Sequence, residues 1–169
     1  LRGMYAIPEL TPYFVNTRKI VRRQINGFYD PLPVAALNPL WAGEKDWLPE
    51  TGATLAPLTG DVVVEERTFQ LRPGGVPAFV AACEAHGVRA LAPLSDRTIG
   101  AFVSAIGPLH QVALWWWFRD GAERDARLAA LVGNSDWRDF LAEIAPALTD
   151  QTSLLLQPRP VPEMSPLFA

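Results

Sequence analysis

A short, aromatic and almost wholly apolar segment constrains the fold of this chain most. Residues 111–118 read QVALWWWF and lie between a turn-like Gly-Pro pair at 107–108 and a polar stop at 119–121. A run this short, with boundaries this sharp, predicts a central β-strand rather than a helix. Neighbouring strand residues point to opposite faces, which predicts two sets of side chains: Val112, Leu114, Trp116 and Phe118 on one face, and Ala113, Trp115 and Trp117 on the other. Both faces are apolar, so one should be covered by helices and the other by a second sheet, a partner subunit or a ligand.

Composition argues against several classes of protein. The chain has 169 residues and a formal net charge of −3, whereas phosphate recognition usually needs a basic surface, so we expect no nucleic-acid binding. No run approaches the roughly 18 apolar residues of a membrane span. A single cysteine, Cys83, with two histidines leaves almost no ligands for a Cys/His metal site. We therefore expect no metal and no membrane span.

Other absences point the same way. The chain has no Walker loop, no G-x-G-x-x-G and no G-x-S-x-G, so nucleotide-binding and acyl-transfer enzymes lack their signals and we expect no cofactor. The first residues lack a signal-peptide core. A lone cysteine fits a reducing compartment. Together these features predict a cytoplasmic protein.

Residues 1–60 differ in character from the rest of the chain. Prolines interrupt this region throughout, at Pro8, Pro12, Pro31, Pro33, Pro39, Pro49 and Pro57. At this density proline disrupts both helices and strands, and only 12–28 keeps a helical pattern. The region is nonetheless rich in aromatic residues, unlike a disordered tail. We predict an irregular, extended arm over 1–60 that packs onto its own domain or contacts another chain.

From residue 61 the pattern becomes regular. Strands are predicted over 61–71, 97–105 and 152–156, in addition to the Trp-rich strand. Apolar spacing predicts a helix that starts at Val76 and a second helix over 122–132. The last helix follows an N-cap at Ser135, and its apolar stripe consists of Trp137, Phe140, Leu141, Ile144 and Leu148.

This order of elements, βαββα(α)β, predicts an α+β, ferredoxin-like domain with an antiparallel sheet over 61–158, followed by a tail at 159–169. Such a domain covers only one sheet face with its own helices. Because the Trp-rich strand is apolar on both faces, the other face should be buried against another copy or the arm. We therefore expect a homodimer that forms through the sheet face.

Two motifs resemble the NIPSNAP family. VEERTFQLRPG at 64–74 resembles the pattern E-x-R-x-Y-x-L-K/R-P-G of that family's opening strand, and IGPLHQV at 106–112 resembles its turn I/G-x-L-N-x-V. Further matching residues follow in order: Trp116, Phe118, Ala122, Glu123, Arg124, Trp137 and Phe140. The resemblance covers about residues 61–158. It implies a dimeric α+β barrel, with small-molecule binding or a scaffold role.

Three positions depart from the family pattern. Phe69 stands where the family often has Tyr, His110 where it has Asn, and Leu114 where it has His. If those polar groups serve a ligand site in relatives, this chain has lost part of that site or moved it to His110.

The candidate catalytic residues are Glu65, Arg67 and His110. Glu65 and Arg67 share one face of a strand, where Arg67 could clamp a substrate carboxylate and Glu65 could act as a base of raised pKa. The alternative that we favour is a structural ion pair, or an exposed strand end. His110 enters the Trp-rich strand from a turn and could act as a general base, although such turn histidines are common. The candidate ligand-binding residues are Arg67, Phe69, Leu114, Trp116 and Phe118.

Two functions follow from these patterns. The first is a NIPSNAP-like homodimeric binding or assembly protein with a hydrophobic sheet face and a partner-docking arm. The second is a cofactor-independent isomerase, cyclase or oxygenase, or a carrier, that holds a small hydrophobic or aromatic molecule between sheet and helices. We favour the first because no residue pair forms a specific catalytic signature, and whether the chain is an enzyme stays open.

Overall fold

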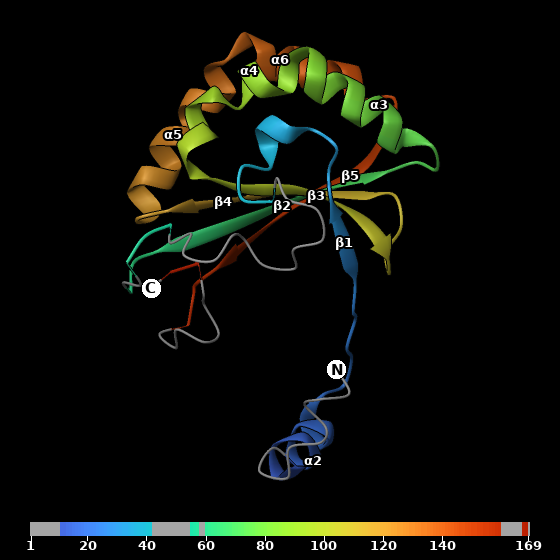
Figure 1. Ribbon diagram of the computed structural model, residues 1–169, viewed down its shortest axis with the longest axis vertical. Helices are drawn as coiled ribbons and strands as arrows, with labels where there is room; N and C mark the ends of the chain where they lie inside the picture. The colour runs from blue at the N-terminus through green and yellow to red at the C-terminus, as the bar shows by residue number, and fades with distance from the viewer. Residues whose placement is uncertain (1–10, 42–54, 58–59, 160–166, 169) are drawn as a thin grey trace.

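A five-stranded antiparallel sheet with the strand order β1-β3-β4-β2-β5 forms the centre of the fold. The structure is a computed structural model that describes residues 11–41, 55–57, 60–159 and 167–168. The four longer strands are β2 (Val63–Leu71), β3 (Thr98–Ile106), β4 (Gln111–Phe118) and β5 (Leu148–Leu156). Helices α3 (Gly75–Ala82), α4 (Val88–Ala90), α5 (Gly121–Gly133) and α6 (Ser135–Ile144) form a layer over one face of the sheet (Figure 1). Strands β2 to β5 with these helices confirm the ferredoxin-like α+β fold that the sequence predicts.

The two faces of β4 differ as its alternation predicts. Val112, Leu114, Trp116 and Phe118 belong to the core beneath the helices. Trp117 and Trp115 belong to a second apolar cluster on the helix-free face. The doubly apolar strand therefore contributes to two separate cores.

Aromatic rings fill the core between sheet and helices. Phe79 of α3 lies 5.3 Å from Phe69 and 5.4 Å from Phe140 between ring centroids, and Trp137 stacks on Phe140 at 5.3 Å. Aromatic pairs at these distances contribute about 0.5–1.5 kcal/mol each beyond their burial. They fasten α3 and α6 to β2.

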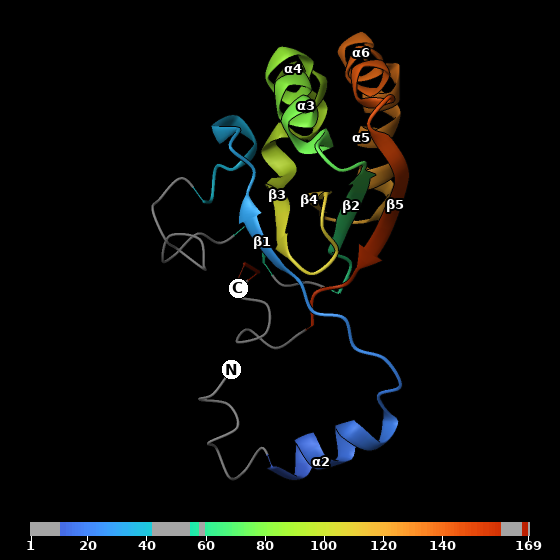
Figure 2. The ribbon, with the colours of Figure 1, turned by 90° about the vertical axis from the view of Figure 1, so that its right-hand side faces the viewer.

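Part of the N-terminal region is built into this domain. β1 (Phe28–Pro31) pairs antiparallel with β3 and extends the sheet on that side (Figure 2). The 3-10 helix η2 (Ala35–Leu37) follows, and Leu37 is buried in the core. Asn38 fixes this segment, since its Nδ2 donates to the Leu32 carbonyl at 2.7 Å and its Oδ1 accepts from the Ala101 amide at 2.9 Å.

The proline pattern did not predict β1, although an edge strand tolerates Pro31. Helix α2 (Thr11–Ile20) lies away from the sheet (Figures 1 and 2). It begins one residue before the segment 12–28 expected to be helical and ends within it. The remaining parts of the predicted arm, 1–10, 42–54 and 58–59, lie outside the described residues, as do 160–166 and 169 of the predicted tail.

Three local features differ from the sequence prediction. The last helix is capped by Asn134, whose side chain accepts from the Asp136 amide at 2.9 Å, and not by Ser135. Leu148, expected in the apolar stripe of that helix, begins β5 instead, so this strand is longer than predicted. The helix predicted to start at Val76 is α3, and it continues through one π-helical segment, η3 (Cys83–Gly87), into α4.

Candidate functional site

A buried ion triad lies on the helix side of β2. Glu65 is fully buried, and its two carboxylate oxygens bind different arginines: Arg67 Nη2 donates to Oε1 at 2.8 Å, and Arg124 Nε donates to Oε2 at 2.7 Å. Arg67 also lies over the Trp116 ring, with its Cζ 5.4 Å from the ring centroid, and donates to Ser153 Oγ at 3.3 Å. The triad thus connects β2, β4, β5 and α5.

The charges around Glu65 determine its chemistry. Burial alone would raise the pKa of Glu65, but the hydrogen bonds and charges of Arg67 and Arg124 outweigh it and hold that pKa below its ordinary value. A general base at neutral pH needs a raised pKa instead. With both oxygens bound to arginines, Glu65 is placed as a structural anion. This geometry supports the structural interpretation of the pair Glu65–Arg67.

The predicted ligand-binding residues contribute to the helix-side core. Phe69, Leu114, Trp116 and Phe118 are each at most 2% exposed and belong to the packed cluster beneath the helices. Within the described part of the chain, the Trp116 indole Nε1 has no hydrogen-bond partner. The Arg67 side chain is 12% exposed, and it contacts β5 through Ser153.

His110 lies away from this triad. It sits in the turn before β4 with a φ of 58°, a left-handed conformation that Asn, Asp and His adopt more readily than other side chains. Its carbonyl accepts from the Leu71 amide at 2.8 Å. Leu71 is four residues beyond Arg67 on β2, or roughly 13 Å at the usual strand rise. The structure therefore brings Glu65, Arg67 and Trp116 together, but not His110.

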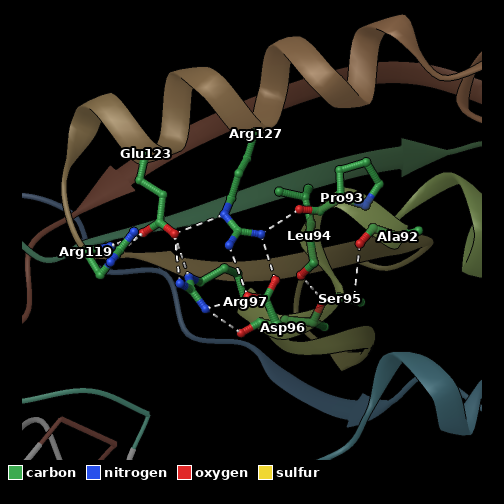
Figure 3. A network of polar contacts seen from close by, with 10 residues as sticks. Ala92, Pro93, Leu94, Ser95, Asp96, Arg97, Arg119, Glu123 and Arg127 are labelled. Carbon is green, nitrogen blue, oxygen red and sulfur yellow. Dashed lines mark hydrogen bonds and ion pairs between the residues drawn. The ribbon is translucent and has the colours of Figure 1, made fainter.

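A second polar network, which the sequence did not indicate, fastens α5 to the segment before β3 (Figure 3). Glu123 accepts from Arg97 Nη2 at 2.8 Å, from Arg127 Nε at 3.0 Å and from the Arg119 amide at 2.9 Å. Asp96 joins the network by accepting from Arg127 Nη1 at 2.7 Å. Burial would raise the pKa of Glu123, but these hydrogen bonds lower it to about 2.

A pocket of about 260 Å³ lies on the opposite, helix-free face of the sheet. Its lining residues come from four strands and from both ends of the chain: Tyr29, Trp41, Glu66, Ile99, Phe102, Trp115 and Leu167. Sequence reasoning missed it because β1 and the packing of Leu167 were not predicted. The doubly apolar pattern of β4 was the signal that something covers this face.

Two polar groups lie at this pocket. The Tyr29 hydroxyl donates to Gln111 Oε1 at 2.6 Å, and its pKa is raised by burial and by the charge of Glu66. Glu66 Oε1 accepts from Thr68 Oγ1 at 3.1 Å. Among the described residues, no cationic side chain forms an ion pair with Glu66. Glu65 and Glu66 are adjacent in sequence but lie on opposite faces of the sheet. Glu65 binds two arginines, whereas Glu66 forms no ion pair with any described residue.

Comparison with known proteins places the chain in a family. The NIPSNAP family profile matches residues 64–162. The chain belongs to the NIPSNAP family. A NIPSNAP-like domain protein from Burkholderia xenovorans is 33% identical, over 61% of this chain and 90% of that chain, with a TM-score of 0.57. A NIPSNAP family protein from Agrobacterium tumefaciens is 26% identical over the same shares, with a TM-score of 0.56. No curated protein matches the chain.

The triad and the pocket relate differently to the NIPSNAP match. Glu65, Arg67 and Arg124 all lie within the matched residues, and they link the E-x-R motif of the opening strand to the A-E-R motif at 122–124. The pocket residues Tyr29 and Leu167 lie outside the match. Part of the pocket is therefore built by segments beyond the NIPSNAP region of this chain.

The described residues contain neither a membrane-spanning helix nor a cluster of metal ligands. None of their helices is long and apolar enough to cross a bilayer. No group of three His, Cys, Asp or Glu side chains in this part of the chain is placed to hold a metal ion.

Proposed function

We propose that this NIPSNAP protein is a homodimeric binding and assembly protein of the cytoplasm, whose sheet face and β5 edge receive a second copy. The observation that carries this proposal is the exposure of β5. Seven of its nine residues are exposed although it is one of the longest strands in the sheet. An edge strand offers unpaired amide and carbonyl groups to any strand that approaches it.

The side chains of β5 favour a protein partner. Leu154 is 54% exposed and Leu155 is 52% exposed, and the register opposite Glu66 and Glu65 places them on the two faces of the sheet. Natural edge strands usually carry lysine, proline or a bulge that prevents pairing. The segment 148–156 has neither lysine nor proline, and Asp150 is its single charge. Its one register shift against β2 lies at its start, between Leu148 and Asp150, and leaves the stretch 150–156 regular. A second β5 running antiparallel would cover both leucines.

The chain's own segments cover another part of the helix-free face. Phe168 packs edge-on against Trp117, with ring centroids 6.3 Å apart, and Trp41 packs against Phe102. These contacts lie over β3 and β4 and leave the side of the face near β5 for the second copy.

Helix α2 supports the role of the arm in docking. Its Val15 and Ile20 are exposed, and Arg18 and Lys19 lie in its last turn. Exposed apolar and basic side chains on one helix suit an acidic protein partner. We expect this partner to be separate from the β5 contact, so removal of residues 11–25 should leave the dimer intact.

A carrier function is the second candidate, and the pocket near Trp115 favours it. The predicted catalytic residues Glu65, Arg67 and His110 do not line this pocket. The alternative of an enzyme therefore gains less support from the geometry than that of a binding protein.

Sedimentation equilibrium over a range of protein concentrations tests the dimer. We expect the native chain to be dimeric and Leu154→Lys to be monomeric, because a lysine on an edge strand opposes pairing with another strand. Val132→Lys is the matched control, since Val132 is 67% exposed and belongs to helix α5, outside the sheet. A native chain that stays monomeric, or a dimer that tolerates Leu154→Lys, would refute the proposal.

A further inference from the structure

We propose that the pocket on the helix-free face binds a small organic ammonium ion, a quaternary or methylated amine, held against aromatic rings and paired with Glu66. The proposal concerns a site of this chain alone and does not depend on the homodimer. It rests on the shape of the pocket walls, on the charge at the pocket and on the size of the cavity.

Aromatic rings form most of the wall. Trp41 and Phe102 meet at 87° with their centroids 5.0 Å apart, so they make two sides of a corner. Trp115 and Tyr29 add two more rings to the lining. The face of an aromatic ring is electron-rich and attracts a cation within about 6 Å, most strongly when the ring is that of tryptophan. Rings set at an angle allow one cation to contact several of them.

Glu66 supplies the negative charge that such a ligand needs. It is partly buried on β2, and no described arginine or lysine pairs with it. The nearest arginine in sequence, Arg67, points to the other face and binds Glu65 and Ser153. Glu66 itself lines the pocket together with Tyr29. Burial, with a contribution from the Glu66 charge, raises the pKa of Tyr29. A carboxylate partly removed from water without a cation is unfavourable, and a cationic ligand would relieve this.

The same features disfavour other ligands. A carboxylate or phosphate would be repelled by Glu66, and a neutral aromatic molecule would leave Glu66 unpaired. At about 260 Å³ the pocket is slightly smaller than the usual small-molecule site, whose volume is roughly 300–1,000 Å³. A methylated ammonium group is compact and needs few hydrogen-bond acceptors. It therefore fits a small pocket with apolar walls and one carboxylate.

Calorimetric titration of the full chain with choline, compared with its neutral isostere 3,3-dimethylbutan-1-ol, tests the proposal. The two molecules have nearly the same shape and differ in charge. We expect saturable choline binding that is about tenfold tighter than that of the isostere, the effect of a desolvated cation–π contact. Indole signals of Trp41 and Trp115 in NMR spectra should shift with choline. Equal affinities of the native chain for choline and its isostere, or no saturable binding of choline, would overturn the proposal.

Substitutions at two residues, Glu66 and Trp41, locate the site. Glu66→Gln keeps the size of the side chain and should weaken choline binding about tenfold, with the neutral isostere unaffected. Asp150→Asn, which removes an exposed carboxylate on β5, is the matched control and should change nothing. Trp41→Leu should abolish binding, whereas Trp41→Phe should retain part of it. Undiminished choline binding in folded Glu66→Gln would also overturn the assignment.

Discussion

Replacement of Glu65 by glutamine tests the central ion triad. The change keeps the shape of the side chain but removes its charge, and leaves Arg67 and Arg124 facing each other across a neutral group. Removal of one partner from a buried ion pair typically costs about 3–5 kcal/mol. Glutamine retains one acceptor oxygen, and the two arginine side chains keep 12% and 21% exposure. We therefore expect a loss of about 2–3 kcal/mol in the free energy of unfolding, below the full range.

Chemical denaturation followed by tryptophan fluorescence would measure this loss, and thermal unfolding should show a decrease in Tm of about 4–12 °C for a chain of this length. The pKa of Glu65 is lowered in the folded state. Its contribution is therefore present above the unfolded pKa and is lost as the pH falls through the folded value. The stability difference between native chain and Glu65→Gln should shrink in acid.

Glu66→Gln is the matched control for this experiment. It makes the same chemical change one residue further along β2, on the opposite face, and should cost less than about 0.5 kcal/mol. A Glu65→Gln variant as stable as Glu66→Gln, or a stability difference that grows in acid, would refute the argument that the triad depends on the Glu65 charge.

Three further predictions follow from the structure. Glu123→Gln should lower the free energy of unfolding by about 2 kcal/mol at pH 7, after allowance for solvent screening. Because the folded pKa of Glu123 is about 2, denaturation curves should show this difference vanish between about pH 4.5 and 2. A difference that stays constant across this range would contradict the prediction. His110→Asn should raise the free energy of unfolding by up to about 1 kcal/mol, because Asn tolerates a φ of 58° better than His does. A loss of stability in the same assay would count against strain at this turn. Burial raises the pKa of the Cys83 thiol to about 12, so a thiol reagent at pH 8 should react only after denaturation, and rapid labelling of the native chain would contradict this.

Local patterns sufficed for much of the fold. The alternation of β4 follows from the period of a strand, so the assignment of Trp115 and Trp116 to opposite faces needed no knowledge of the rest of the chain. The helix cap shows the limit of such patterns. Asn134 and Ser135 are both good N-cap residues, and only the hydrogen bond from the Asp136 amide distinguishes them.

Features that depend on distant pairing could not be predicted. β1 exists because β3 offers it an edge, while its own sequence, FYDP, shows no strand periodicity. Glu65 and Arg124 lie 59 residues apart, and nothing near Glu65 indicates that a second arginine reaches it. The aromatic pocket combines Tyr29, Phe102 and Leu167 from segments far apart in the chain. Its existence is a property of the folded sheet.

The two edges of the sheet are unequal, and this limits how many copies can join through them. β1 has four residues and contains Pro31, whereas β5 has nine residues without proline. A pair formed through β5 would use the long edge of both copies and leave only the short β1 edges outside. Growth would stop at two subunits related by a twofold axis. The same inequality guards the chain against the open-ended strand addition that produces fibres.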